Sequence, residues 1–142
     1  MFRMQIGKYP IKIIEKVMEA FSITSNGLAE LNLREIKNPI FRKCFGLKSF
    51  FQYQLYLSSS YVEGYRFEVF LFGYDADLEK IEVIVDRAIY VEICNKPLVG
   101  KPQLFITNDR NFINFLEDVF KCKKFTSTTS GLMKIAENSK PK

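Results

Sequence analysis

The most regular pattern in the chain is an alternation of apolar and polar residues between Tyr65 and Cys94. A repeat of two residues is typical of a β-strand with one buried face. It occurs in two segments, separated by an acidic connection, which predicts a long antiparallel hairpin. The second segment, from Ile81 to Cys94, is long for one strand, so we expect a bulge or bend near Asp86 and Arg87.

A different spacing, of three and four residues, appears near both ends of the chain and is typical of amphipathic helices. It predicts a first helix from Pro10 to Phe21, because proline is favoured in the first turn of a helix. A last helix is expected after the capping residues Thr107 to Asp109. Its apolar stripe is formed by Phe112, Phe115, Leu116 and Val119.

Two further strands are predicted by alternation, one from Phe50 to Leu57 and a short one from Gln103 to Thr107. The segment from Leu28 to Ile36 fits a short helix or a strand equally well, and both interpretations stay open. Asn38 and Pro39 end it, since the residue before a proline is disfavoured in the helical conformation.

These elements predict an α+β fold in a single compact domain covering residues 1–125. We expect an antiparallel β-sheet meander of three to five strands, flanked by an N-terminal and a C-terminal α-helix, with the helices on one face. Residues 126–142 lack a sustained periodicity, which predicts a flexible polar C-terminal tail.

Length and composition agree with one domain. A chain of 142 residues with 47% hydrophobic residues can bury a substantial core. There is no apolar run of the length that a membrane-spanning helix needs, and the first residues lack the continuous apolar stretch of a secretory signal. We therefore expect a cytoplasmic protein without membrane insertion.

Residue usage argues against most catalytic and metal sites. The chain has no histidine, which removes the usual general base and the usual zinc ligand. Its three cysteines, Cys44, Cys94 and Cys122, do not have the spacing of a zinc knuckle or a disulfide framework. We predict no enzyme, no metal and no cofactor.

Charge is distributed in blocks, and the predicted hairpin differs in sign from its surroundings. The balance of charged residues is +5 for residues 1–48, −4 for residues 49–100 and +4 for residues 101–142. The tip of the hairpin combines aromatic and acidic residues, and its first strand ends apolar on both faces, so it must be covered twice or bind a partner. The predicted partner-binding residues are Phe70, Phe72, Tyr74, Asp75, Asp77 and Glu79.

A second candidate site is the basic and aromatic stretch that follows Ile40. Cations beside aromatic rings are typical of single-stranded nucleic-acid sites, where cations contact phosphates and rings stack on bases. The residues predicted for this alternative are Arg42, Lys43, Phe45, Lys48 and Tyr53. Arg87, on an otherwise apolar face, is predicted either to emerge at the bend or to contact an anion.

The sequence thus leaves two function classes. The first is a small protein-binding module without catalysis, of the immunity, inhibitor or chaperone kind, acting through an aromatic and charged sheet surface. The alternative is a nucleic-acid-binding module. The expected partner is another protein, and a homo-oligomer could form through an exposed sheet edge.

Overall fold

The computed structural model describes residues 10–141, and every structural statement below refers to these residues. The elements follow one another as α1 (Pro10–Thr24), β1 (Glu30–Glu35), α2 (Pro39–Phe45), β2 (Phe51–Ser58), β3 (Phe67–Tyr74), β4 (Ile81–Val85), α3 (Arg87–Cys94), β5 (Gln103–Ile106), α4 (Asp109–Lys121) and α5 (Lys123–Ser139). The strands form one antiparallel sheet in the order β1-β2-β3-β4-β5. The predicted α+β fold with a meander and helices at both ends of the chain is confirmed.

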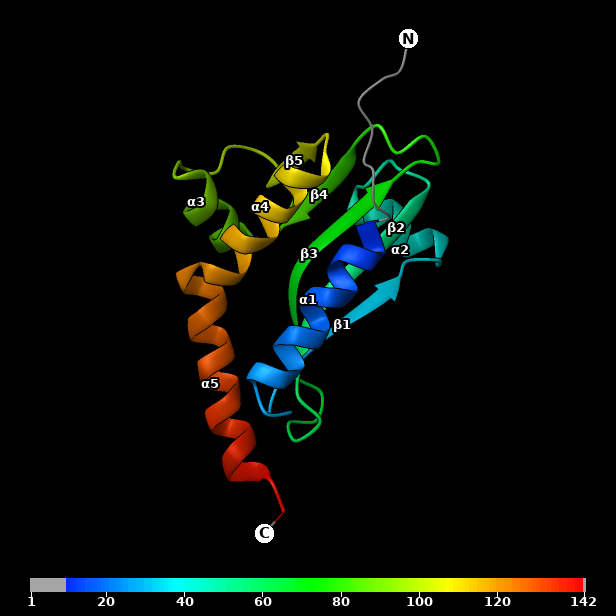
Figure 1. Cartoon of the computed structure of the whole chain (residues 1–142). Helices are drawn as coiled ribbons and strands as arrows, with labels where there is room; N and C mark the ends of the chain where they lie inside the picture. The colour runs from blue at the N-terminus through cyan, green and yellow to red at the C-terminus, as the bar shows by residue number, and fades with distance from the viewer. Residues whose placement is uncertain (1–9, 142) are drawn as a thin grey trace.

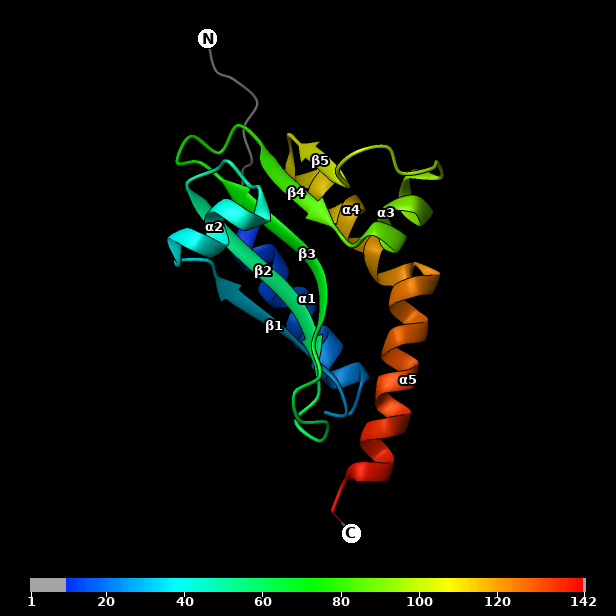
Figure 2. The same ribbon diagram turned by 180° about the vertical axis from the view of Figure 1, so that it is seen from behind.

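Helices cover the sheet unequally on its two sides. On one face, which we call the front face, α1 lies over β1 to β3 and α4 lies towards β4 and β5 (Figure 1). On the back face, the short helix α2 covers only one end of the sheet (Figure 2). α3 and α5 lie beside the sheet, next to α4.

The main core lies between the sheet and the front-face helices, and aromatic rings dominate it. Phe70 and Phe72 of β3 are fully buried, and they pack against Phe112 and Phe115 of α4 with ring centroids 5.3 to 6.5 Å apart. Aromatic pairs at such distances stabilise a core beyond the area that they bury. β3 is the third of the five strands and carries the centre of this core.

A smaller core lies on the back face, beneath α2. Leu71 points to this side because it lies between Phe70 and Phe72, and it packs with Ile36 and Leu47. Phe45 and Ile84 cover this cluster. Thus the end of β3 is buried on both faces, which explains why its sequence is apolar on both.

The prediction that the second strand of the hairpin continues to Cys94 is wrong beyond Val85. The strand ends there, and residues Arg87–Cys94 form α3 instead of continuing the strand. Asp86 starts the helix, since its side chain accepts hydrogen bonds from the backbone N–H groups of Ala88 and Ile89. The bend expected near Asp86 is therefore the start of a helix, with Asp86 as its cap.

The predicted flexible tail is also replaced by regular structure. Residues Lys123–Ser139 form α5. Phe125, Thr129, Leu132 and Ala136 are buried, and their spacing of four, three and four residues puts them on one face of the helix. The run of threonine and serine residues between them hid this stripe in the sequence.

Other predicted elements agree closely with the structure. The first and last predicted helices correspond to α1 and α4, and the two further strands correspond to β2 and β5. The open alternative for residues 28–36 is decided in favour of a strand, β1. The helix α2 was not predicted.

Candidate functional site: the surface around α2

The predicted aromatic tip of the hairpin is not a surface. Phe70 and Phe72 are fully buried and Tyr74 is 3% exposed, because α1 and α4 cover the front face of β3. Tyr74 stacks on Phe51 and Tyr53 within the core. These three aromatic side chains are not available to a partner, and that part of the predicted site is corrected.

The acidic half of the predicted tip forms a tight turn. The backbone N–H of Leu78 donates to the Asp75 carbonyl at 3.0 Å, and Asp77 accepts from the backbone N–H of Glu79. The side chain of Asp75 also accepts from the backbone N–H of Phe50 at 2.8 Å. The turn therefore supports the segment that leads into β2.

Exposed apolar side chains lie on and beside the helix α2, which precedes that segment. Asn38 caps the helix through a 2.9 Å hydrogen bond from the backbone N–H of Ile40 to its side-chain oxygen, and Pro39 is the first helical residue. The helix ends at Gly46, whose φ of 85° is readily adopted by glycine alone. Local sequence thus fixes both ends of α2.

Arg42 fixes α2 to the chain on either side of it. Its guanidinium donates to the backbone carbonyls of Ile36, Ser49 and Phe50 at 2.6 to 3.3 Å, and it lies 5.8 Å from the centre of the Phe50 ring. This arginine therefore has a structural role, because both of its terminal nitrogens donate to protein carbonyls.

Glu82 of β4 holds the same segment from beneath. One carboxylate oxygen accepts hydrogen bonds from the backbone N–H groups of Lys48 and Ser49 and from the Ser49 hydroxyl, at 2.7 to 2.9 Å. The other oxygen accepts from the side-chain amide of Gln103 at 3.0 Å. Glu82 is 3% exposed, so a buried charge with several hydrogen bonds fixes the exit from α2.

Three large apolar side chains remain exposed on this fixed segment. Ile40 is 70% exposed, Phe41 49% and Phe50 70%. We call these three residues the α2 surface. Isolated exposed apolar residues are ordinary, whereas a group of them on one rigid segment is typical of an interaction site.

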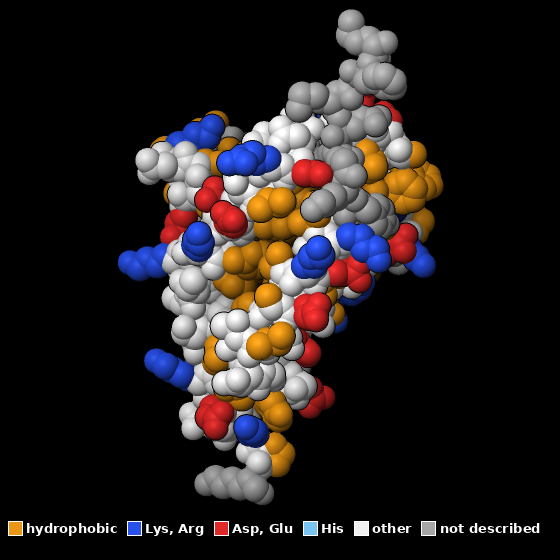
Figure 3. Space-filling view, viewed as in Figure 1, with side chains coloured by type: hydrophobic (Ala, Val, Ile, Leu, Met, Phe, Trp, Pro, Cys, Tyr) orange, Lys and Arg blue, Asp and Glu red, His pale blue; other side chains and the backbone are white. Residues whose placement is uncertain are grey.

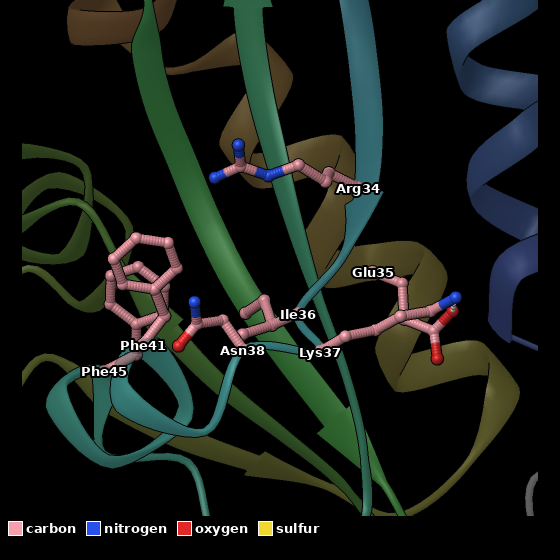
Figure 4. A pocket seen from close by; sticks show the side chains of 7 residues that line it. All are labelled: Arg34, Glu35, Ile36, Lys37, Asn38, Phe41 and Phe45. Carbon is pink, nitrogen blue, oxygen red and sulfur yellow. Dashed lines mark ion pairs between the residues drawn. The ribbon is translucent and has the colours of Figure 1, made fainter.

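A pocket of about 210 Å³ lies beside the α2 surface, between α2 and the end of β1. Figure 4 shows Phe41 and Phe45 on one side of it and Arg34 reaching over the sheet on another. The two rings are stacked with centroids 6.0 Å apart. The pocket therefore has an aromatic wall and a cationic wall.

Charge around the α2 surface is mainly positive. Lys37, Lys43 and Lys48 are exposed, as is Arg34. The Lys37 ammonium lies 3.6 Å from the Glu35 carboxylate, and the Arg34 guanidinium donates to the Gln54 side chain at 2.6 Å. An acidic segment of a partner would be attracted to such a surface.

The residues predicted for nucleic acid are brought together only in part. Lys43 and Lys48 are exposed, and Phe45 is half-buried against Leu71. Tyr53 is buried on the opposite face of the sheet, where it stacks on Phe72, so it cannot contact a base.

Arg87 is not in a cleft with these residues. It is the exposed first residue of α3 and follows the Asp86 cap. Because the cap already satisfies the N–H groups of the first turn, this position does not require an anion. Arg87 is exposed, as expected for an arginine that emerges from the sheet, but it does so at the start of α3 and not at a bend within a strand.

A second hollow lies on the front face, between α1 and α4. Figure 3 shows apolar side chains in the middle of this face, and Ile13, Val17, Ile113, Leu116 and Phe120 line the hollow. Its volume is about 320 Å³. Ile13 and Leu116 are buried in the core and Val17 and Phe120 are half-buried, whereas Ile113 is exposed, as are Glu117 and Lys121 at its rim.

The described residues contain no group of three or more cysteine, aspartate and glutamate side chains that could hold a metal ion.

Burial raises the pKa of the Cys122 thiol. The sulfur of Cys122 accepts a hydrogen bond from the backbone N–H of Phe125, and this residue therefore caps α5. No helix in the described part of the chain has the length and apolar character needed to cross a membrane.

Sequence reasoning identified the stretch from Ile40 to Phe51 as basic and aromatic but did not select Ile40, Phe41 or Phe50 as contacts. The signal was present in Asn38-Pro39, which is a cap followed by a favoured first helical residue and therefore starts a helix as well as ending the preceding element. Had a helix been predicted here, Arg42 and the exposed apolar residues beside it would have been expected on different sides of that helix.

Searches against protein-family models, curated proteins and solved structures found no match to this chain.

Proposed function

We propose that this protein is a non-catalytic module that binds another protein through the α2 surface, as immunity proteins, inhibitors and small chaperones do. The observation that carries the proposal is the exposure of Ile40, Phe41 and Phe50 on a segment fixed by Arg42 and Glu82. Apolar and aromatic side chains dominate the energetics of protein interfaces, and rigid ones lose little entropy on binding. A cytoplasmic location remains part of this proposal.

The partner segment that fits this surface is apolar and acidic. Its apolar side chains would contact Ile40, Phe41 and Phe50, and one of them could enter the pocket beside Phe45. Its carboxylates would pair with Lys43 and with the other cations around the α2 surface. Opposite charges at the rim of an interface accelerate association and orient the partner.

Nucleic acid fits the same surface less well. Two of the five residues that would form such a site have other roles, because Tyr53 is buried and Arg42 donates to backbone carbonyls. Ile40 is as exposed as Phe50, yet an aliphatic side chain offers no flat ring on which a base can stack. These features favour a protein partner.

The proposal can be tested with a library of random peptides displayed on phage, selected against the whole protein. We expect the enriched peptides to combine aromatic or aliphatic residues with Asp or Glu. Ile40→Asp should weaken their binding by on the order of tenfold or more. Because an acidic residue is favoured in the first turn of a helix, this substitution should leave α2 folded.

Ile113→Asp is the matched control, since it makes the same change at the exposed isoleucine of the front-face hollow. Loss of binding in Ile113→Asp, with Ile40→Asp unaffected, would move the site to that hollow and contradict the proposal. A single-stranded oligonucleotide should not bind at low salt. Oligonucleotide binding that Lys43→Ala and Lys48→Ala both weaken would instead favour the nucleic-acid alternative.

A further inference from the structure

The outer edge of β1 is an open site for strand pairing. β1 is an outermost strand of the sheet, and no other described element lies beyond it in either view (Figures 1 and 2). The backbone N–H of Ile36 donates to Gln52 of β2 at 2.8 Å. Since backbone groups alternate in direction along a strand, those of Leu31, Leu33 and Glu35 point away from the sheet.

This edge carries three charged residues, Glu30, Arg34 and Glu35, but lacks other features that commonly prevent strands from pairing. β1 contains no proline and no lysine, and its pairing with β2 runs without a bulge from Glu30 to Glu35. The opposite edge strand, β5, has four residues and directly follows Pro102. Short strands and prolines protect edges, so β1 is the less protected of the two.

The two faces of β1 differ in chemistry. Leu31 and Leu33 lie on the front face with α1, where they belong to the main core or pack against it. Glu30, Asn32 and Arg34 alternate with them and lie on the back face. A strand added to this edge must therefore be apolar on one face and complementary in charge on the other.

We propose that two copies of this chain pair through β1, antiparallel, about a two-fold axis at Asn32. In this register Glu30 of each copy lies opposite Arg34 of the other, and Leu31 lies opposite Leu33. Leu31 and Leu33 exchange backbone hydrogen bonds across the axis, because both point outward. Strand β1 thus has a sequence that complements itself on both faces, as a two-fold interface requires.

Neighbouring registers do not have this property. Moving the axis by one residue towards the C-terminus, to Leu33, places the Glu35 carboxylate opposite Leu31 on the apolar face. Moving it to Leu31 places Glu30 opposite Asn32 and leaves Arg34 opposite Leu28, outside the strand. The pattern therefore selects the register centred on Asn32.

Pairing in this register would extend a hydrogen-bond network that already crosses three strands. Arg34 donates to the Gln54 side-chain oxygen, and the Gln54 amide donates to the Glu68 carboxylate, each at 2.6 Å. A guanidinium has five N–H donors, so Arg34 can bind Gln54 and a carboxylate of the second copy together. Arg34 also lines the pocket beside the α2 surface, so the two proposed sites share this residue, whereas Glu30 belongs to the strand-pairing interface and does not line that pocket.

Two charge reversals test the register. In Glu30→Arg, arginine would face arginine at both positions of the pair, and in Arg34→Glu, glutamate would face glutamate. We expect the wild-type protein to be a dimer whose dissociation constant rises on the order of tenfold or more in each variant. An equimolar mixture of the two variants should form a heterodimer, because opposite charges then meet at both positions.

Sedimentation equilibrium and light scattering on the full chain measure these states, and circular dichroism checks that each variant is folded. Recovery of a dimer on mixing cannot come from a general loss of folding, which separates the proposed register from a structural role of Arg34. A wild-type protein that stays monomeric at its highest soluble concentration would overturn the proposal. So would variants that dimerise as well alone as when mixed.

Discussion

At the scale of single residues, Glu82 connects the sheet to the surface that we propose for binding. It is the second residue of β4, and its carboxylate accepts four hydrogen bonds, three of them from Lys48 and Ser49. A buried carboxylate is costly unless its hydrogen bonds are complete, and here the donors come from the segment that leaves α2. The charge therefore determines where Phe50 and α2 lie.

Glu82→Ala should lower the free energy of unfolding by about 2 to 4 kcal/mol, because it leaves several buried donors without an acceptor. Glu82→Gln should cost less, since the amide oxygen can still accept from the backbone N–H groups. Urea denaturation of the two variants measures the difference. If alanine and glutamine proved equally mild, the network would not hold the segment as described.

At the scale of secondary structure, the sequence predicted those elements whose apolar periodicity is unambiguous. α1 and α4 each bury one apolar stripe, and β2, β3 and β5 lie where the sequence alternates, so their predicted positions agree with the structure. α3 was missed because Ile89, Val91 and Ile93 also satisfy the alternation of a strand. Only the cap formed by Asp86 separates the two interpretations, and its hydrogen bonds are visible in three dimensions alone.

The candidate site was predicted in part. The basic and aromatic segment after Ile40 was identified, but which of its rings face solvent depends on the partners that tertiary structure supplies. Tyr53 is covered by its neighbours across the sheet, whereas Phe50 is held at the surface through its backbone. Composition shows that rings are present in a segment, and packing decides which of them can bind.

One contact between two helices explains how α5 is positioned. The Glu92 carboxylate of α3 accepts hydrogen bonds from the backbone N–H groups of Lys123 and Lys124, at 2.9 and 2.7 Å. A carboxylate at a helix N-terminus satisfies N–H groups that lack intrahelical partners and interacts favourably with the helix dipole. Residues far apart in the sequence thereby form the cap.

Glu92→Ala should therefore destabilise the protein by about 1 kcal/mol, the usual cost of losing a helix cap. The backbone amides of Lys123 and Lys124 should exchange faster in this variant than in the wild-type protein. Under the same conditions, the exchange rates of the β3 amides should be unchanged. The stability of Glu92→Gln should lie between those of the wild-type protein and Glu92→Ala. Unchanged exchange at Lys123 in the alanine variant would contradict this role.

At the scale of the whole molecule, α5 contributes to the core and connects several elements. α5 buries Phe125, Thr129, Leu132 and Ala136, and it packs against α3 and α4 (Figure 1). Phe125 also contacts Phe21 of α1, with ring centroids 5.8 Å apart. The first and last described helices, α1 and α5, therefore contact each other through this aromatic pair.

Ending the chain after Thr126 should consequently lower the free energy of unfolding by about 3 kcal/mol or more, since Leu132 alone contributes about 2 kcal/mol of burial. A tail without packing would change it by less than about 0.5 kcal/mol. Ending the chain after Ser139 is the matched control, because it removes only the residues that follow α5. Thermal and urea denaturation of both shortened proteins decide between the two, and a stable protein ending at Thr126 would show that α5 does not contribute to the core.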